Sequence, residues 1–226
     1  MASTTFSLEA ALRSLDEEGY VVLEDTGVGG IVSEMEQREF AFLSPYGLDY
    51  CKQHVLDNPR VRSILEALFN RCSLGHWLRY NELPGHFECF SKGGSEAGLH
   101  FLAVHQWPKG SRVACWNGSH RANLPTQTSR RSTFETTQAA LVEAGFKVDV
   151  REFPEGALVI RDPRLYIESR TGYAITFMFA KEEVLAGWPK IVLLDKPGLR
   201  EKVAKMESTK IGVNFAFQDP SGKLNT

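Results

Sequence analysis

From residue 74 onward, the chain consists of many short segments with the composition of β-strands. Aromatic and β-branched residues fill these segments, and turn-forming residues such as Pro84 and Gly85 separate them. The predicted strands are His76–Tyr80, His86–Phe90, Leu99–Trp107, Arg112–Trp116, Lys147–Val150, Ala157–Ile160, Tyr173–Phe179, Ile191–Leu194 and Val213–Phe217. A series of short strands with regular turns indicates a β-sandwich or a β-barrel.

The first third of the chain has the periodicity of amphipathic helices instead. Ser7 is a typical helix-capping residue, and Gly19 is a typical residue at a helix end. The apolar positions between them follow helical spacing: Leu8, Ala11, Leu12 and Leu15. A short strand is predicted at Tyr20–Leu23, and a second helix is predicted to begin at Asn58 and Pro59.

Three further segments carry weaker patterns. The glycine-rich segment Thr26–Gly30 predicts a loop without the spacing of a dinucleotide-binding motif. The polar segment Ala122–Thr137 predicts an exposed loop in which Arg130 and Arg131 are solvated. The charged segment Lys196–Lys210 has apolar residues at helical spacing, which predicts a surface helix.

No internal repeat or interdomain linker interrupts the chain, so we predict a single domain over residues 1–226. Its residues 1–73 form a mainly helical N-terminal part, and residues 74–226 form a β-barrel core. The composition is 42% hydrophobic and 24% charged, which is typical of a folded globular chain. A chain of 226 residues can bury a substantial core without disulfides or structural metals.

Charge and cysteine content exclude several classes of protein. The 26 basic and 28 acidic residues give a formal net charge of −2, so there is no basic excess for nucleic acid. No apolar run approaches the ~20 residues of a membrane span, and Met1–Phe6 lacks the pattern of a signal peptide. The four cysteines form no C-x-x-C pair. We therefore predict a cytoplasmic protein with reduced thiols that binds neither nucleic acid nor a membrane.

The strongest candidate for a chemical site is the pair His86 and Glu88. Residues i and i+2 of a strand point to the same face, so an imidazole and a carboxylate would lie side by side. Two histidines and one carboxylate form the metal-binding triad of non-haem iron oxygenases. By itself, however, the H-x-E pattern recurs by chance.

Four segments give this pair a context: Leu15–Leu23, Asp57–Leu68, Cys115–Pro125 and Pro154–Tyr166. They resemble segments of the phytanoyl-CoA dioxygenase-like family of iron/2-oxoglutarate oxygenases, and the N-G-S-H-R turn within Cys115–Pro125 is the most recognisable of them. The chain is similar in size to fungal terpenoid and polyketide biosynthetic members. The resemblance implies a mainly β fold with flanking helices, a double-stranded β-helix (jelly roll, cupin-like) with helices packed on one sheet.

The resemblance also implies where the ligands of the metal would lie. The family's first two ligands, H-x-D, fall at His86 and Glu88. Its third ligand, a histidine, falls at Ile167, and the chain has no histidine after His120. The family's arginine for the cosubstrate carboxylate has its nearest match in Arg170, which comes earlier in the chain. The metal site implied by the family is therefore degenerate in this sequence.

The remaining histidines do not replace the missing ligand. His100 and His105 are five residues apart in one predicted strand, so they lie on opposite faces. His105 shares its face with Ala103 and Trp107, which predicts a hydrogen-bonded core histidine. His120 lies in the G-S-H-R turn, which is not a ligand position in the family.

These observations favour a metal-free and non-catalytic subunit, a pseudoenzyme without a cofactor of its own. In this hypothesis the chain pairs with an intact, iron-bearing relative in secondary-metabolite (terpenoid-type) biosynthesis. The resulting heterodimer would stabilise the relative and shape its pocket for a small-molecule substrate near the interface. A homodimer is the other possible assembly.

Two enzymatic hypotheses stay open. In the first, His86 and Glu88 bind iron(II) with an unexpected third group, and the chain is an active 2-oxoglutarate-dependent oxygenase. In the second, the chain is a metal-free isomerase or cyclase in which His86 and Glu88 transfer protons. Either enzyme would turn over its substrate without a partner.

Overall fold

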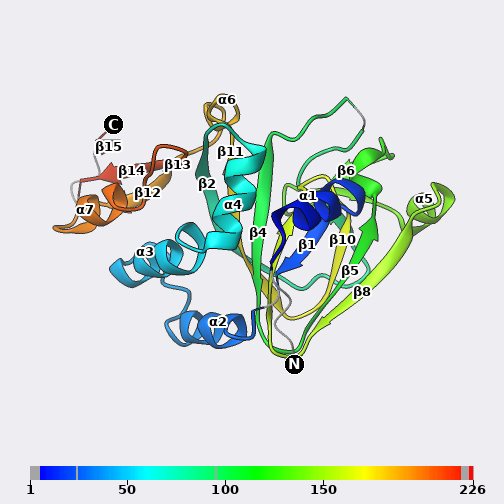
Figure 1. Ribbon diagram of the computed structural model, residues 1–226, viewed down its shortest axis with the longest axis horizontal. Helices are drawn as coiled ribbons and strands as arrows, with labels where there is room; N and C mark the ends of the chain where they lie inside the picture. The colour runs from blue at the N-terminus through cyan, green and yellow to red at the C-terminus, as the bar shows by residue number, and fades with distance from the viewer. Residues whose placement is uncertain (1–5, 24, 95, 220–223, 226) are drawn as a thin grey trace.

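The computed structural model describes residues 6–23, 25–94, 96–219 and 224–225, and a pair of six-stranded sheets dominates it (Figure 1). The first sheet has, in spatial order, the strands β1 (Tyr20–Leu23), β9 (Ala157–Arg161), β4 (Phe101–Trp107), β11 (Tyr173–Ala180), β2 (Cys72–Asn81) and β13 (Ile211–Val213). The second sheet has the strands β6 (Gln127–Thr128), β7 (Phe134–Thr136), β3 (Phe87–Cys89), β10 (Ile167–Thr171), β5 (Ser111–Asn117) and β8 (Lys147–Phe153).

The chain passes repeatedly from one sheet to the other. Strands β2, β4, β9 and β11 belong to the first sheet, whereas β3, β5, β8 and β10 belong to the second. Along the chain, β2 to β5 alternate between the sheets, and β8 to β11 alternate again in the reverse sense. This order is that of a double-stranded β-helix, or jelly roll, so the predicted fold class is confirmed.

Helices cover the outer face of the first sheet. They are α1 (Leu8–Glu17), α2 (Val28–Gln37), α3 (Pro45–Cys51) with the π-helical turn Lys52–Leu56, and α4 (Pro59–Leu68). Leu102 and Val104 of β4 belong to the apolar core shared with these helices, whereas Trp107 belongs to the core between the sheets. Figure 1 shows α4 lying across β2 and β4, with α2 and α3 on the same side. Residue alternation along the strands of the first sheet thus separates two cores, one under the helices and one inside the β-helix.

The predicted barrel core extends to residue 226, but strands at the end of the chain form a separate third sheet. Strand β14 (Phe215–Gln218) lies between β12 (Ile191–Leu194) and β15 (Leu224–Asn225). The short helix α6 (Glu182–Leu185) precedes β12 in the chain, α7 (Leu199–Ala204) follows β12, and α5 (Gln138–Glu143) precedes β8. In Figure 1 the third sheet and α7 lie near α3, away from the second sheet.

The predicted helix ends in the N-terminal part are confirmed. The Ser7 side chain caps α1 by accepting a hydrogen bond from the amide of Ala10 at 3.3 Å. Gly19 follows the helix with a φ of +90°, a left-handed conformation that only glycine adopts easily. Asn58 caps α4 by accepting from the amides of Arg60 and Val61.

The loop predicted at Thr26–Gly30 is wrong, because α2 already begins at Val28. The reason is packing: a Cβ atom at Gly29 would lie 2.2 Å from the carbonyl oxygen of Glu155. Gly29 therefore allows the helix to approach the turn before β9, and its presence does not signal a loop.

The segment Ala122–Thr137 is not an exposed loop throughout, because β6 and β7 lie within it. Strand β7 pairs with β3 and extends the second sheet, so cross-strand hydrogen bonds determine its conformation despite its polar composition. Lys196–Lys210 also differs from its prediction: only Leu199–Ala204 is helical, and Gly198 before it has a φ of +83°.

Candidate functional site

A narrow cavity lies between the two sheets, and neighbouring strands of the first sheet form its polar wall. The register places His105 of β4 directly opposite Thr176 of β11. Arg161 of β9 lies opposite Ala103, two residues along β4 from His105, so its side chain also faces inward. The residues around the cavity are Tyr80, Glu88, Cys89, Phe90, His105, Trp107, Arg131, Thr133, Arg161, Ile167, Ser169, Ala174 and Thr176.

Three buried side chains of this wall form a hydrogen-bonded chain. Arg161 donates from Nε to Nε2 of His105 at 3.1 Å and from Nη1 to the carbonyl oxygen of Leu165 at 2.7 Å. Because Nε2 of His105 accepts, its proton lies on Nδ1, which is 2.8 Å from Oγ1 of Thr176. Burial and the neighbouring guanidinium lower the pKa of His105 well below its ordinary value. His105 is therefore a neutral, hydrogen-bonded core histidine, as its position in the strand pattern predicts.

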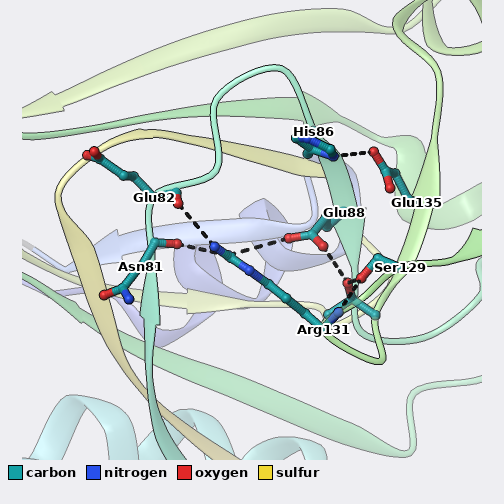
Figure 2. A network of polar contacts seen from close by, with 8 residues as sticks. Asn81, Glu82, His86, Glu88, Ser129, Arg131 and Glu135 are labelled. Atoms are coloured by element: carbon teal, nitrogen blue, oxygen red, sulfur yellow. Dashed lines mark hydrogen bonds and ion pairs between the residues drawn. The ribbon is translucent and has the colours of Figure 1, made fainter.

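Glu88 and Arg131 meet at the opposite wall of the cavity (Figure 2). Oε1 of Glu88 accepts a hydrogen bond from Thr133 at 2.7 Å, and Oε2 lies 3.7 Å from Nη1 of Arg131. The Arg131 guanidinium also donates to the carbonyl oxygens of Asn81 and Glu82 at 2.8 and 3.0 Å. The prediction that Arg131 is solvated is therefore wrong: it ties the loop before β7 to the end of β2.

His86 lies apart from this network. Strand β3 begins at Phe87, so His86 precedes the strand and the rule of alternating faces does not govern it. Its Nδ1 atom is 2.6 Å from Oε1 of Glu135, and its side chain is 46% exposed. Figure 2 shows His86 directed to Glu135 while Glu88 turns to Arg131. The two predicted ligand groups thus have separate partners, and His86 is not among the residues that border the cavity.

Ile167 lies where the resemblance implies the third ligand. It is the Cα partner of Glu88 across the β10–β3 pair, and it borders the cavity as a buried residue. Arg170, the predicted cosubstrate residue, does not border the cavity. Its Nε atom donates to Oε2 of Glu168 at 2.7 Å, two residues away on the same strand. The structure therefore brings Ile167, and neither His86 nor Arg170, to the cavity beside Glu88.

The side chains of the cavity do not fit the iron of an oxygenase. A facial triad needs two imidazoles and a carboxylate directed at one point. Here the cavity offers the single carboxylate of Glu88, and both ring nitrogens of His105 are already engaged by Thr176 and Arg161. Within the described part of the chain, no group of three or more His, Cys, Asp and Glu side chains is arranged to hold a metal ion.

A larger hollow lies outside the cavity and has apolar walls. Tyr80, Phe90, Arg131 and Thr133 border both spaces. The outer hollow has a volume of about 740 Å³, which is within the range of small-molecule sites. Its apolar residues are Phe42, Leu43, Trp77, Leu78, Phe101, Met178, Trp188, Pro189, Ile191 and Val192. The arrangement suits a molecule with an apolar body and one polar group that enters the inner cavity.

Solved structures with the same fold include those of HygX and SnoN. HygX from Streptomyces hygroscopicus with iron bound has a TM-score of 0.54 and 13% identity, over 96% of this chain and 97% of that chain. HygX with nickel, 2-oxoglutarate and hygromycin B bound has a TM-score of 0.54 and 13% identity, over 89% and 93%. SnoN, a non-heme alpha ketoglutarate dependent epimerase from nogalamycin biosynthesis, has a TM-score of 0.50 and 13% identity, over 77% and 83%. At this identity, the likeness shows the fold.

No family model matches the chain, and no curated protein matches its sequence. None of the helices in the described part of the chain is long and apolar enough to cross a membrane. All four cysteines are free and buried.

Arg161 is the site residue that sequence reasoning missed. The alternation of residues in the predicted strand Ala157–Ile160 could have indicated it, because Arg161 follows Ala157 and Val159 at every second position. Those two residues belong to the core between the sheets, so the next residue in that phase also points inward. A charged residue at an inward-facing strand position marks a buried polar site.

Proposed function

We propose that this chain is a metal-free, non-catalytic subunit that pairs with an intact iron/2-oxoglutarate oxygenase in secondary-metabolite biosynthesis. The observation that carries the proposal is the pairing of Glu88 with Ile167 inside the cavity. An aliphatic side chain there removes one metal ligand, and the contact of His86 with Glu135 removes another. The fold and its hollow are retained although the ligand set is not, which favours ligand binding over oxygen chemistry. We place the protein in the cytoplasm.

Exposed apolar side chains around the outer hollow support a partner at this face. Leu43, Leu78 and Val192 are 50%, 49% and 38% exposed, and all three border the hollow. Burying such residues against another protein removes apolar surface from water and stabilises the complex. A partner seated here would close the hollow and contribute to its walls. The preferred partner is the iron-bearing relative, and a second copy of this chain is the alternative.

Reconstitution tests the proposal. The purified chain is analysed for iron and assayed for 2-oxoglutarate decarboxylation alone and together with an intact oxygenase from the same pathway. We expect no iron and no turnover alone, a stable 1:1 complex in the mixture, and higher activity or stability of the oxygenase within it. His86→Ala in this chain should cost the mixture little activity. Stoichiometric iron with turnover by the isolated chain would overturn the proposal in favour of an active oxygenase.

The proposed interface has its own matched test. Leu78→Glu places a charge beside the outer hollow and should weaken the complex at least about tenfold. Val148→Glu on β8 is the control, because Val148 is 43% exposed and does not border the hollow. If both variants weaken the complex equally, or if neither weakens it, the interface lies elsewhere.

A further inference from the structure

We propose that the inner cavity binds the carboxylate of a small organic acid, with the Arg161 guanidinium as its counter-ion. This inference rests on the proposed function in one respect, namely that the cavity receives a ligand without a metal. It assigns the chemical class of that ligand from a residue that neither the metal site nor the cosubstrate site of an oxygenase accounts for.

The first argument is that Arg161 is a buried cation without an anionic partner. Its side chain lies inside the β-helix, and the residue is only 2% exposed. Its acceptors are the neutral ring of His105 and the carbonyl oxygen of Leu165, and the Phe90 ring lies 4.7 Å from its guanidinium carbon. Among the described residues, no carboxylate forms an ion pair with it, and Nη2 has no hydrogen-bond acceptor. A buried charge without a counter-ion is costly, so the site favours an anion.

The neighbouring carboxylates are committed to other cations. Asp162 follows Arg161 in the chain, but its two oxygens accept from Arg164 at 2.9 and 2.6 Å. Glu88 accepts from Thr133 and faces Arg131. The charged side chains that border the cavity are therefore Arg131, Arg161 and Glu88, which sum to +1. A monoanion balances this charge, whereas the second charge of a phosphate would meet Glu88 without compensation.

The size of the two spaces supports a carboxylate on an apolar body. The inner cavity has a volume of about 30 Å³, enough for one small polar group. The outer hollow is much larger and has aromatic walls that include Trp77 and Trp188. Tyr80 and Phe90 border both spaces, and their rings pack edge to face with centroids 5.1 Å apart. The apolar body therefore stays in the outer hollow against this pair, and only its carboxylate extends past the rings to Arg161.

Binding of a matched acid and amide to the isolated chain tests the inference. The probes are 1-naphthylacetate and the uncharged 1-naphthylacetamide, which share one ring system. Titration calorimetry should show the acid binding at least about tenfold more tightly, since a charge-assisted hydrogen bond contributes more than a neutral one. The Arg161 Nε–H signal in nitrogen-edited NMR spectra should shift with the acid and not with the amide. Inorganic phosphate should not compete.

Variants assign the preference to one residue. Arg161→Gln should abolish the preference for the acid, and Arg161→Lys, which keeps the charge, should retain part of it. Arg112→Gln is the control, because it removes an equal charge from the exposed side of β5, where Arg112 pairs with Glu152. Equal affinity for both probes, binding of neither, competition by phosphate, or a preference that survives Arg161→Gln would each overturn the inference. The NMR signal of the unmodified chain keeps the test valid if a variant does not fold.

The outcome is separable from that of the proposed function. Acid binding by a chain that forms no complex with an oxygenase would support this inference and overturn the partner role. A functional complex in which this chain shows no preference for the acid would support the partner role and overturn this inference.

Discussion

At the scale of single residues, His105 and Arg161 determine each other's state. The Arg161 Nε–H group donates to His105 and keeps the imidazole proton on Nδ1. The same guanidinium disfavours a second proton on the ring, and burial acts in the same direction on the pKa of His105. The result is one neutral and one charged side chain on adjacent strands, so the positive charge of this wall stays on the arginine.

This pair predicts a pH dependence of stability. Because the folded state lowers the pKa of His105 below its ordinary 6.5, the unfolded chain binds more protons at acidic pH. The stability from His105 is thus complete above about pH 6.5 and decreases as the pH falls. His105→Gln keeps a donor and an acceptor but does not titrate. We expect the free energy of unfolding, measured with urea, to fall between about pH 6.5 and 5.5 by about 1 kcal/mol more in the unmodified chain than in the variant.

The comparison with a variant is necessary because other histidines titrate in the same sense. Burial also lowers the pKa values of His54, His76 and His120, so they contribute to the slope of both proteins. Identical pH profiles for the two proteins would mean that His105 is not held neutral by the fold.

At the scale of elements, two contacts between distant segments hold parts of the fold together. One joins the end of α1 to the turn after β5, and the other joins the loop before β7 to the end of β2. Gly19 ends α1 directly against the turn that follows β5, and the His120 ring of that turn bonds to the carbonyl of Asp16 at 3.0 Å. Arg131 holds the loop before β7 against the end of β2. Both contacts join segments that are distant in sequence, so each depends on the assembled fold.

We expect the substitution Gly19→Ala, which adds one methyl group, to reduce the stability of the chain strongly. A Cβ at residue 19 would lie 2.6 Å from Nδ1 of His120, in addition to the cost of a φ of +90°. Gly85→Ala is the matched control, because Gly85 has a φ of +80° and open space around it. We expect Gly85→Ala to cost about 1 kcal/mol and Gly19→Ala about 1–3 kcal/mol more, measured by chemical unfolding. Equal costs would show that His120 moves aside freely.

The Arg131 contact predicts local loosening. Arg131→Ala removes two hydrogen bonds to the carbonyls of Asn81 and Glu82 and leaves Glu88 with Thr133 alone. Stability should fall by about 1 kcal/mol, and amide exchange should accelerate around Ser129–Thr133. Arg130→Ala is the control, since Arg130 is an exposed neighbour. Exchange that accelerates equally in both variants would contradict the assigned role.

At the scale of the whole molecule, the fold is a three-layer arrangement of helices, first sheet and second sheet. The large core under the helices joins residues from Ala11 to Ile211, whereas the core between the sheets is smaller and surrounds the cavity. The four cysteines are distributed over this structure: Cys51 in α3, Cys72 in β2, Cys89 in β3 and Cys115 in β5. Their reactivity therefore reports on global unfolding.

Thiol labelling provides that measurement. Burial raises the pKa of Cys89 to about 11 and those of Cys72 and Cys115 to about 12, so few thiolates exist at neutral pH. Ellman's reagent should react very slowly with the native chain and rapidly with all four thiols in denaturant. Rapid labelling of a cysteine under native conditions would show that its layer opens locally.

The sequence was sufficient for the elements whose signals are local. Neighbouring residues were enough to predict the helix caps Ser7 and Asn58 and the glycine that ends α1. The alternation of residues in one strand was enough to predict that His105 is buried. Ile167, the position at which the resemblance implies a histidine ligand, is the Cα partner of Glu88. The single domain stays a prediction, and strands that the predicted barrel included form a separate third sheet.

Other features were decided only by contacts between distant segments. Strand β7 forms because β3 pairs with it, and Gly29 belongs to a helix because α2 packs on the turn at Glu155. His86 does not lie at the predicted site because its side chain is hydrogen-bonded to Glu135, which is 49 residues away in the chain. The sequence by itself indicated a β-sandwich or barrel, and its resemblance to a family implied the jelly roll; the degenerate ligand set stays a prediction. The tertiary structure decided that Arg161 supplies the charge of the cavity, because strand register places it beside His105 while Asp162 pairs with Arg164 and Glu88 faces Arg131.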